Sequence, residues 1–320
     1  MIDISNADIF ADVVGQEKAK NKLNFFLRGH RNTGVVPALI FDAAKGLGKT
    51  YLAKEFRKGL LVRDGEDKGQ RKPLHSLNCA TIKNASQFVE WIISNRLQEK
   101  HITIFLDECH KLPADLSDVL LTVLQPNAKN RNTLTFKDYV LDFDMSKITW
   151  LFATSEVHKL NKPLLDRLER ISLEEYDTNQ LAEIIRRNLK GIEFDEGVLE
   201  NDIVSVLKNN ARAAQKMAGH IKSYLGSMTT FFREDWLEIK KALGILPLGL
   251  TPVEVRVLEI LKEHKETSLT RLAACTGLSA EAIRCDAESP LLRLDLMQIT
   301  TGGRSLTPKG HDYLKNLSTK

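Results

Sequence analysis

Residues 43–50 read AAKGLGKT, close to the pattern G-x-x-x-x-G-K-S/T of loops that bind phosphate groups. Gly48, Lys49 and Thr50 match the pattern, whereas Ala43 stands where the pattern has its first glycine. In such loops the lysine contacts the β- and γ-phosphates of a nucleotide, and the threonine hydroxyl binds magnesium. Small residues such as Gly46 let the backbone N–H groups approach the phosphates closely. The stretch by itself is equally consistent with a chance match or with a loop that has lost its function.

An acidic pair, Asp107 and Glu108, comes directly after the strand-like run ITIFL. An aspartate at a strand end can hold magnesium through water, and a neighbouring glutamate can orient and deprotonate an attacking water. The alternative is an acidic strand end that caps the following helix. Cys109 and His110 have no partner at a ligand spacing, and we interpret both as structural.

Three further polar residues could complete a nucleotide site. Ser155 ends the run ITWLFATS and could hydrogen-bond the γ-phosphate or the attacking water; the alternative is a helix N-cap. Arg167 follows a proline-led turn and could face a neighbouring subunit, although a surface arginine would look the same. Arg212 lies at the start of the helix-like stretch ARAAQKMAG, from which it could reach back to the nucleotide.

The elements that position these residues alternate between strands and helices over residues 1–175. The apolar runs PALIFDA, ITIFLDE and ITWLFATS are typical of buried parallel strands, and each ends in small or polar residues. The helix-like segments GQEKAKNKLNFFLRG, KTYLAKEFRKGL and ASQFVEWIISNRL lie between them. This order predicts a doubly wound α/β domain, in which ligands bind beyond the carboxyl ends of the strands.

The remainder of the chain predicts two smaller domains. Residues 176–246 contain apolar residues at helical spacing, and we expect this part to be wholly helical. The stretch LGILPLGLTP is rich in glycine and proline and predicts a boundary. Residues 247–320 contain short helical patterns followed by the glycine-tipped hairpin LMQITTGGRSLTP, which indicates a winged helix-turn-helix.

Composition places few limits on the function. Hydrophobic residues make up 42% of the 320 residues and charged residues 28%, as in ordinary globular proteins. The chain has no apolar run of the ~18 residues that a membrane span needs, and the N-terminal stretch MIDISNADIF does not resemble a secretory signal, so we expect a cytoplasmic protein. The net charge of +4 permits nucleic-acid binding without requiring it. The four cysteines form no CxxC pair and predict buried, reduced thiols.

Taken in order, these motifs resemble those of the AAA+ ATPases, and within that class those of the RuvB family of Holliday junction branch-migration motors. The resemblance covers nearly the whole chain. It begins at FADVVGQEKAKNKLNFFL, which is similar to the adenine-side segment of the family, and continues through the phosphate loop, LDECHKL and FATSE. The segment PLLDRLERISLEEYDTNQLAEII is similar to the arginine-finger region, NNARAAQKMAGHI to the sensor-2 helix, and the C-terminal part to the winged-helix domain.

The resemblance implies an AAA+ domain, a helical lid and a winged helix, with ATP and Mg²⁺ as cofactors, and a ring, usually a hexamer, that works on duplex DNA. It implies that Asp107 and Glu108 are the Walker B pair, that Ser155 is sensor 1, and that Arg167 acts in trans on the ATP of the neighbouring subunit, with Arg170 as second choice. The residues that it implies at the nucleotide and its magnesium are Val14, Gly46, Leu47, Gly48, Lys49, Thr50, Tyr51 and Arg212, with Asp107 as the second magnesium ligand.

Two departures from the family pattern bear on function. Ala43, Ala44 and Lys45 replace a Gly-Pro-Pro lead into the loop, and alanine would cost about 1–2 kcal/mol if the first position required a positive φ. Because the phosphate and magnesium residues are all present, we predict a working site. The hairpin NRNTLTFKDYVLDFD is shorter than in the family and carries charged residues in its middle, so we expect no conventional partnership with the junction-binding protein RuvA.

The C-terminal hairpin is the candidate DNA contact. Residues 250–320 contain ten Lys or Arg and nine Asp or Glu, so net charge alone does not attract DNA. Arg304 follows the glycine pair of the hairpin and Lys309 lies beyond it, where both could contact phosphates without reading sequence. The alternative is a plain hairpin with a solvated arginine.

The sequence therefore predicts an ATP-driven DNA motor that translocates on duplex DNA or drives branch migration in recombination, repair or replication. One alternative is an AAA+ loader or switch that remodels a replication complex without translocating. A second is a DNA-binding regulator that binds ATP without hydrolysing it.

Overall fold

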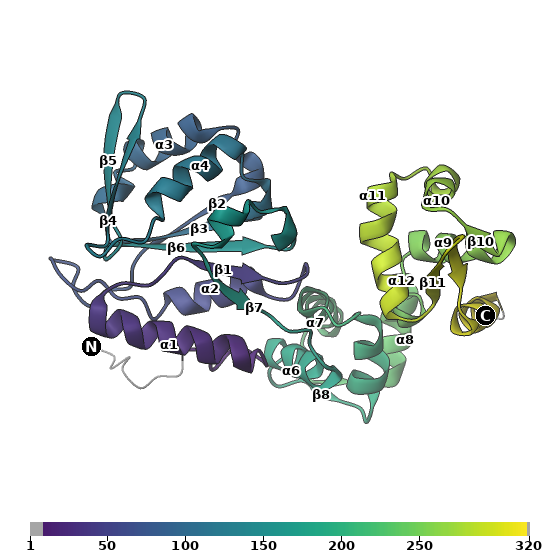
Figure 1. Ribbon diagram of the computed structural model, residues 1–320. Coiled ribbons are helices and arrows are strands. Elements are labelled where there is room, and N and C mark those ends of the chain that lie inside the picture. Colours follow the sequence, from purple (N-terminus) through teal and green to yellow (C-terminus); the bar gives the residue numbers. More distant parts are fainter. Residues whose placement is uncertain (1–8, 319–320) are drawn as a thin grey trace. The chain divides into compact units, whose positions relative to one another are not determined.

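The computed structural model describes residues 9–318 of the chain, and the first eight residues of the N-terminal stretch discussed above lie outside them. Residue contacts divide the chain into two compact units (Figure 1). The first unit extends to Ile184 and includes Asn209–Gln215; the second comprises Ile185–Lys208 and Lys216–Lys320. None of the helices among the described residues is long and apolar enough to cross a membrane.

A five-stranded parallel sheet forms the centre of the first unit, with strand order β2-β3-β6-β1-β7. The three strands predicted from the sequence are present as β1 (Leu39–Asp42), β3 (Ile102–Asp107) and β6 (Ile148–Thr154), and they occupy the interior of the sheet. The edge strands β2 (Leu74–Asn78) and β7 (Glu169–Ser172) were not predicted. Both are short and partly exposed, so neither has the continuous apolar run that marks a buried strand.

Helices cover both faces of this sheet, which confirms the predicted doubly wound α/β fold. Figure 1 shows α1 (Glu17–Thr33) and α2 (Lys49–Arg57) on one face, and α3 (Ala85–Ser94) and α4 (Ala114–Val123) on the other. The apolar sides of α3 and α4 pack with β3 and β6 into one continuous core. The short helix α5 (Lys162–Leu165) leads into the edge strand β7.

An antiparallel hairpin precedes the central strand β6, as the sequence predicts. Its strands are β4 (Arg131–Phe136) and β5 (Tyr139–Asp144), and the turn between them consists of Lys137 and Asp138. Lys137 has a positive φ of 52°. The hairpin exposes apolar surface beside this charged turn, because Tyr139 is 45% and Val140 66% exposed.

The part of the chain predicted to be wholly helical also contains strands, so that prediction was wrong in detail. Helices α6 (Thr178–Asn188), α7 (Ala211–Leu225) and α8 (Arg233–Ala242) are accompanied by the parallel pair β8 (Glu193–Phe194) and β9 (Thr230–Phe231). The ring centroids of Phe194 and Phe231 lie 5.5 Å apart. A two-residue strand leaves no periodic signal in the sequence, and its stability comes from this tertiary contact. The predicted helical structure between β8 and α7 is present as a π-helix, η5 (Val198–Ile203), and a 3₁₀-helix, η6 (Val204–Val206).

The C-terminal part of the second unit is a winged helix, as predicted. Its elements are α9 (Pro252–His264), α10 (Leu269–Thr276), α11 (Ala280–Ala282), η8 (Ile283–Glu288), α12 (Ser289–Arg293), β11 (Met297–Thr300), β12 (Gly303–Leu306) and α13 (Pro308–Ser318). The predicted hairpin is β11 and β12, and the short strand β10 (Glu266–Thr267) adds a third strand next to β12. A capping box of Thr251 and Glu254 begins α9.

Candidate active site

The phosphate-loop segment connects β1 to α2, and its glycines are required by the backbone. Gly46 and Gly48 have φ values of 84° and 94°, a region that L-residues with a side chain rarely adopt. Gly48 immediately precedes α2. The free N–H groups of the first helical turn therefore point out of the helix beside the loop, in the geometry that binds anions.

Ala43 is not strained. Its backbone does not have a positive φ, whereas the two loop glycines do. The cost that we considered for an alanine at this position therefore does not arise. The side chain is buried, and the Ala43 carbonyl accepts a hydrogen bond of 2.8 Å from Lys49 Nζ. The departure at position 43 leaves the shape of the loop intact.

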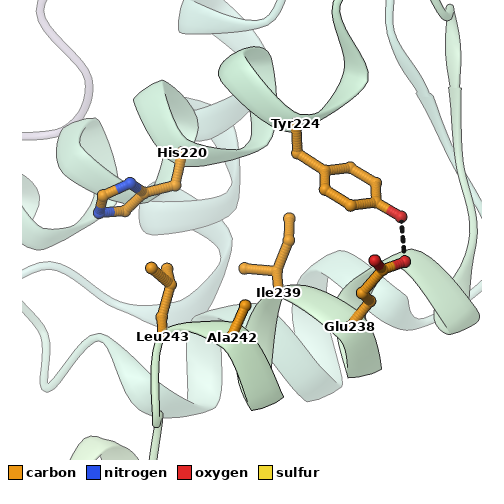
Figure 2. Close-up of a pocket in the computed structure, with 6 residues that line it drawn as sticks. All are labelled: His220, Tyr224, Glu238, Ile239, Ala242 and Leu243. Atoms are coloured by element: carbon orange, nitrogen blue, oxygen red, sulfur yellow. Dashed lines mark hydrogen bonds between the residues drawn. The ribbon is translucent and has the colours of Figure 1, made fainter.

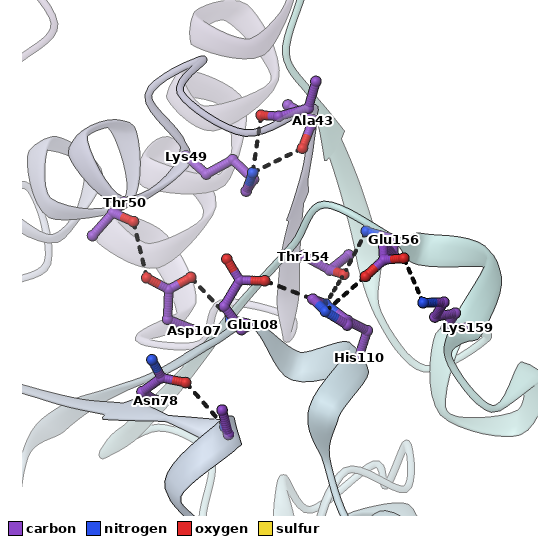
Figure 3. Close-up of polar contacts among 12 residues, drawn as sticks. Ala43, Lys49, Thr50, Asn78, Asp107, Glu108, His110, Thr154, Glu156 and Lys159 are labelled. Carbon is purple, nitrogen blue, oxygen red and sulfur yellow. Dashed lines mark hydrogen bonds and ion pairs between the residues drawn. The ribbon is translucent and has the colours of Figure 1, made fainter. Parts of the chain in front are cut away.

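The carboxyl end of β3 lies next to the start of α2. Thr50 Oγ1 donates a 3.0 Å hydrogen bond to Asp107 Oδ2, so the two predicted magnesium ligands are in direct contact (Figure 3). Lys49 is 7% exposed, and burial lowers the pKa of its ammonium while the nearby carboxylates of Glu108, Asp107 and Asp42 raise it. The carboxylates and the buried ammonium form one electrostatic cluster.

Glu108 is held at the end of β3 by an unusual backbone conformation and by a histidine. Its φ is 53°, which is rare for a residue other than glycine and typical of functional sites. Its Oε2 lies 3.4 Å from Nδ1 of His110, and the same nitrogen lies 3.0 Å from Oγ1 of Thr154. Nε2 of His110 lies 3.0 Å from Oε2 of Glu156 (Figure 3). Our interpretation of His110 as purely structural missed these contacts, which no spacing in the sequence indicates.

Ser155 follows β6 directly and has a buried hydroxyl. Its Oγ has no hydrogen-bond partner among the described residues. The residue that precedes the next turn, η4 (Val157–Lys159), is Glu156, so the alternative of Ser155 as a helix N-cap is wrong. A buried hydroxyl without a partner is costly, and a ligand oxygen would satisfy it.

The start of α7 is hydrogen-bonded to the phosphate loop. The backbone N–H of Arg212 donates to the Gly46 carbonyl at 3.1 Å, and Asn210 Nδ2 donates to the Lys45 carbonyl at 3.2 Å. Burial is the main cause of the lowered pKa of Lys49, and the positive charge of Arg212 adds to it. The contact of Arg212 with the nucleotide stays a prediction. Sequence reasoning missed Asn210, which also caps α7 by accepting from the Ala213 N–H.

These residues fit a magnesium nucleotide. The loop offers backbone N–H groups and a buried ammonium, Thr50 and Asp107 offer oxygen atoms of the kind that Mg²⁺ prefers, and Ser155 offers an unpaired hydroxyl. Glu108 supplies a carboxylate beside this donor set.

Two sequence models of known families match the chain. Residues 39–176 match the ATPase family associated with various cellular activities (AAA), and residues 247–315 match the RuvB C-terminal winged helix domain. The chain therefore combines an AAA ATPase module with a RuvB-type winged helix. Together the two matches contain the phosphate loop, the acidic pair, Ser155 and the winged helix.

Similar proteins span nearly the full length of this RuvB-like chain. The Holliday junction branch migration complex subunit RuvB of Mycoplasma pneumoniae is 22% identical over 98% of both chains. The corresponding subunit of Ehrlichia canis is 26% identical over 97% of this chain and 93% of its own. The solved structure of the Thermotoga maritima RuvB Holliday junction branch migration motor has a TM-score of 0.77 at 23% identity and covers 97% of both chains. This structural likeness shows that the fold is shared.

The two candidate arginine fingers of the RuvB-like chain differ in their contacts. Arg170, on β7, forms an ion pair with Asp42 at the end of β1, with Nε 2.9 Å from Oδ2. Arg167 donates from Nη1 to the Pro163 carbonyl at 2.7 Å within its own turn, and its Nε has no partner among the described residues. Arg170 is therefore engaged within its own chain, and the role of Arg167 in trans stays a prediction.

The adenine-side segment contacts the end of β7 and the following loop. Gln16 is buried and exchanges two hydrogen bonds of 2.8 Å with the backbone of Glu174. Val14 beside it is half-buried. Leu47 in the phosphate loop is also buried, and its carbonyl accepts from the hydroxyl of Tyr176 at 3.2 Å. Tyr51 is 39% exposed, and its hydroxyl lies 3.5 Å from the Asp12 carbonyl.

Both basic residues that are predicted to contact DNA have partners within the chain. Arg304 Nε lies 2.8 Å from Oε2 of Glu288, and Nη2 lies 3.3 Å from Oε1, while Glu288 is buried. The alternative of a solvated arginine is therefore wrong. Lys309 Nζ donates to the Leu294 carbonyl at 2.8 Å. Arg304 connects the wing to the helical segment before it, and its predicted contact with DNA remains a prediction.

A hollow of about 190 Å³ lies on the second unit, between α7 and α8 (Figure 2). The lining residues are His220, Tyr224, Glu238, Ile239, Ala242 and Leu243. The hydroxyl of Tyr224 donates to Glu238 at 2.7 Å, and this bond raises the pKa of the tyrosine. The hollow contains none of the predicted site residues.

Proposed function

We propose that the chain is an ATP-hydrolysing DNA motor of the RuvB type. The observation that carries this proposal is the contact between Thr50 and Asp107, because it brings the magnesium-binding hydroxyl of the phosphate loop to the aspartate at the end of β3. Sequence spacing alone could not exclude a chance match to the loop pattern. The convergence of Lys49, Thr50, Asp107 and Glu108 at one edge of a parallel sheet supports a working hydrolytic site.

In this proposal the residues of the chain divide the chemistry among them. The loop N–H groups and Lys49 hold the β- and γ-phosphates, and Arg212 adds a second positive charge near them. Thr50 and Asp107 would hold magnesium, which neutralises charge on the phosphates when bound. Glu108 accepts the proton of the attacking water, and the Ser155 hydroxyl orients the γ-phosphate or that water.

A neighbouring subunit completes the site in this proposal. Arg167 reaches the nucleotide of the adjacent subunit in a ring, for which a hexamer is the proposed form. An arginine supplied in trans increases kcat for hydrolysis by about 10³–10⁵-fold, so hydrolysis depends on assembly. The proposed location is the cytoplasm.

The proposed substrate is duplex DNA or a four-way junction, since the relatives are named as Holliday junction branch migration subunits. The winged helix would hold part of the DNA. We propose that a RuvA-type partner does not bind in the conventional way, because charged residues form the turn of the short β4–β5 hairpin.

The test is an ATPase assay with no DNA, with duplex DNA and with four-way DNA, on the wild type and on Glu108→Gln. A motor should hydrolyse ATP faster with DNA and should migrate or displace strands. Glu108→Gln should bind ATP normally but lose turnover by roughly 10²-fold or more, because an amide cannot accept the proton. Hydrolysis that responds only to a protein partner would favour a loader. ATP binding without hydrolysis under every DNA condition would favour a regulator and contradict the proposal.

A further inference from the structure

His110 lies between two carboxylates at the end of the central strands. Its side chain is 3% exposed, with Glu108 on one side of the ring and Glu156 on the other. The Glu156 contact is the shorter, at 3.0 Å from Nε2, and Glu108 lies 3.4 Å from Nδ1. The ring therefore connects the proposed catalytic base after β3 to the segment after β6 that carries Ser155 (Figure 3).

Burial keeps this ring neutral near pH 7. Burial lowers the pKa of His110, and the two carboxylates only partly oppose that effect. A neutral imidazole has one N–H donor and one nitrogen that accepts. It can therefore donate to one of the two carboxylates at a time.

The remaining contacts decide which nitrogen carries the proton. Nε2 lies 3.0 Å from a carboxylate oxygen of Glu156, which can only accept a proton, so this contact favours a proton on Nε2. Nδ1 then has a lone pair and can accept from the Thr154 hydroxyl at 3.0 Å. That hydroxyl oxygen in turn accepts from the Glu156 backbone N–H at 3.0 Å. Every donor of this network has an acceptor when the proton is on Nε2.

We propose that Glu156 fixes His110 in the tautomer protonated at Nε2 and thereby keeps the Glu108 carboxylate free to act as the base. With the proton on Nδ1, the ring would present its N–H to Thr154 Oγ1 at 3.0 Å and to Glu108 Oε2 at 3.4 Å, and its share in Glu108 would compete with the attacking water for that oxygen. Glu156 and His110 are thus positioning residues for Glu108. Lys159 supports the arrangement, since its Nζ lies 2.6 Å from Oε1 of Glu156. The inference rests on the proposed hydrolysis of ATP.

Replacing the Glu156 carboxylate with the amide of glutamine tests this proposal. Glu156→Gln can donate to Nε2 and should move the proton to Nδ1. We expect kcat for ATP hydrolysis to fall roughly ten- to a hundredfold, because one charge-assisted hydrogen bond to the carboxylate of the base has an effect of that size. KM and nucleotide affinity should change less than twofold. Glu90→Gln, the same change at an exposed site on α3, is the matched control and should leave kcat unchanged.

A second change at position 110 distinguishes this tautomer effect from a general disturbance. His110→Phe retains a ring but has no N–H, so adding it to Glu156→Gln should restore kcat to the value of His110→Phe alone. A loss that persists in the double variant would overturn the proposal. The ¹⁵N shifts of the His110 ring offer a measurement that needs no second variant: protonation at Nε2 is expected in the wild type, and at Nδ1 in Glu156→Gln. The same tautomer in both proteins would also overturn it. A wild type that hydrolyses no ATP would instead contradict the proposed function.

Discussion

Thr50 Oγ1 donates a 3.0 Å hydrogen bond to Asp107 Oδ2, although 57 residues separate the two in the chain. The contact exists because β1 and β3 are parallel strands on either side of β6, so that their carboxyl ends lie at the same edge of the sheet. The first turn of α2 and the end of β3 are brought together there. The predictions below test what this arrangement does.

Ala43→Gly should not increase ATP hydrolysis. Ala43 has no positive φ, so glycine relieves no strain there. Glycine also increases the conformational entropy of the unfolded chain, and the free energy of unfolding should fall by about 0.4–1 kcal/mol. Steady-state kinetics and urea denaturation measure the two effects. Faster turnover in Ala43→Gly would show that the alanine does impair the loop.

Arg167→Ala should bind nucleotide normally and hydrolyse it about 10³-fold or more slowly, because the arginine acts on the neighbouring subunit. Arg170→Ala is the control, since Arg170 is paired with Asp42 in its own subunit and should have the smaller effect on turnover. Mixing Arg167→Ala with Glu108→Gln subunits should restore some activity, because some interfaces then combine an intact arginine with an intact base. Absence of rescue, together with a monomer in the presence of ATP, would contradict the ring.

Arg304→Ala should destabilise the winged helix. It leaves the carboxylate of Glu288 buried without its partner, and breaking a buried ion pair costs about 3–5 kcal/mol. Since the Arg304 side chain remains 17% exposed, we expect the lower end of that range. Thermal denaturation of Arg304→Ala and of the double variant with Glu288→Ala measures the effect, and the double variant should recover part of the loss.

The same double variant tests the DNA contact without the unpaired carboxylate. If Arg304 also binds a phosphate, the double variant should bind DNA of every sequence more weakly. The slope of the logarithm of the binding constant against the logarithm of the salt concentration should become shallower by about one. DNA-free ATP hydrolysis should not change. An unaltered DNA affinity at low salt would assign Arg304 a structural role only.

The stability of the first unit should increase between about pH 8 and pH 10. Lys72 is fully buried and donates to the Ser146 carbonyl at 2.9 Å, and burial lowers its pKa to about 8. The unfolded chain keeps the usual pKa near 10.4, so it binds more protons than the folded chain in this window. The free energy of unfolding therefore rises with pH there.

Comparison with Lys72→Met isolates this contribution from other groups that titrate in the same range. The difference in free energy of unfolding between wild type and variant should shift in favour of the wild type by a few kcal/mol across the window. Urea denaturation at a series of pH values measures it. A difference that stays constant with pH would mean that Lys72 is not titrating abnormally.

Much of the fold could be predicted because the interior strands and the amphipathic helices leave local patterns. β1, β3 and β6 are mostly apolar since both of their faces are buried, and the helices α1, α2 and α3 repeat apolar residues at helical spacing. The edge strands β2 and β7 and the two-residue pair β8 and β9 leave no such pattern. Those elements exist because a neighbouring strand supplies their hydrogen bonds.

The sequence by itself determined the residue types of the site: a lysine and threonine after a glycine loop, an acidic pair after an apolar strand, and a serine after another. Each is a local feature, since the strand and the functional residues at its end are consecutive in the chain. Only the tertiary structure decided the partners. It paired Thr50 with Asp107, Arg304 with Glu288, and His110 with Glu108 and Glu156. Most of these contacts join residues distant in the chain, and all depend on strand order, backbone conformation and burial, which no spacing of residues encodes.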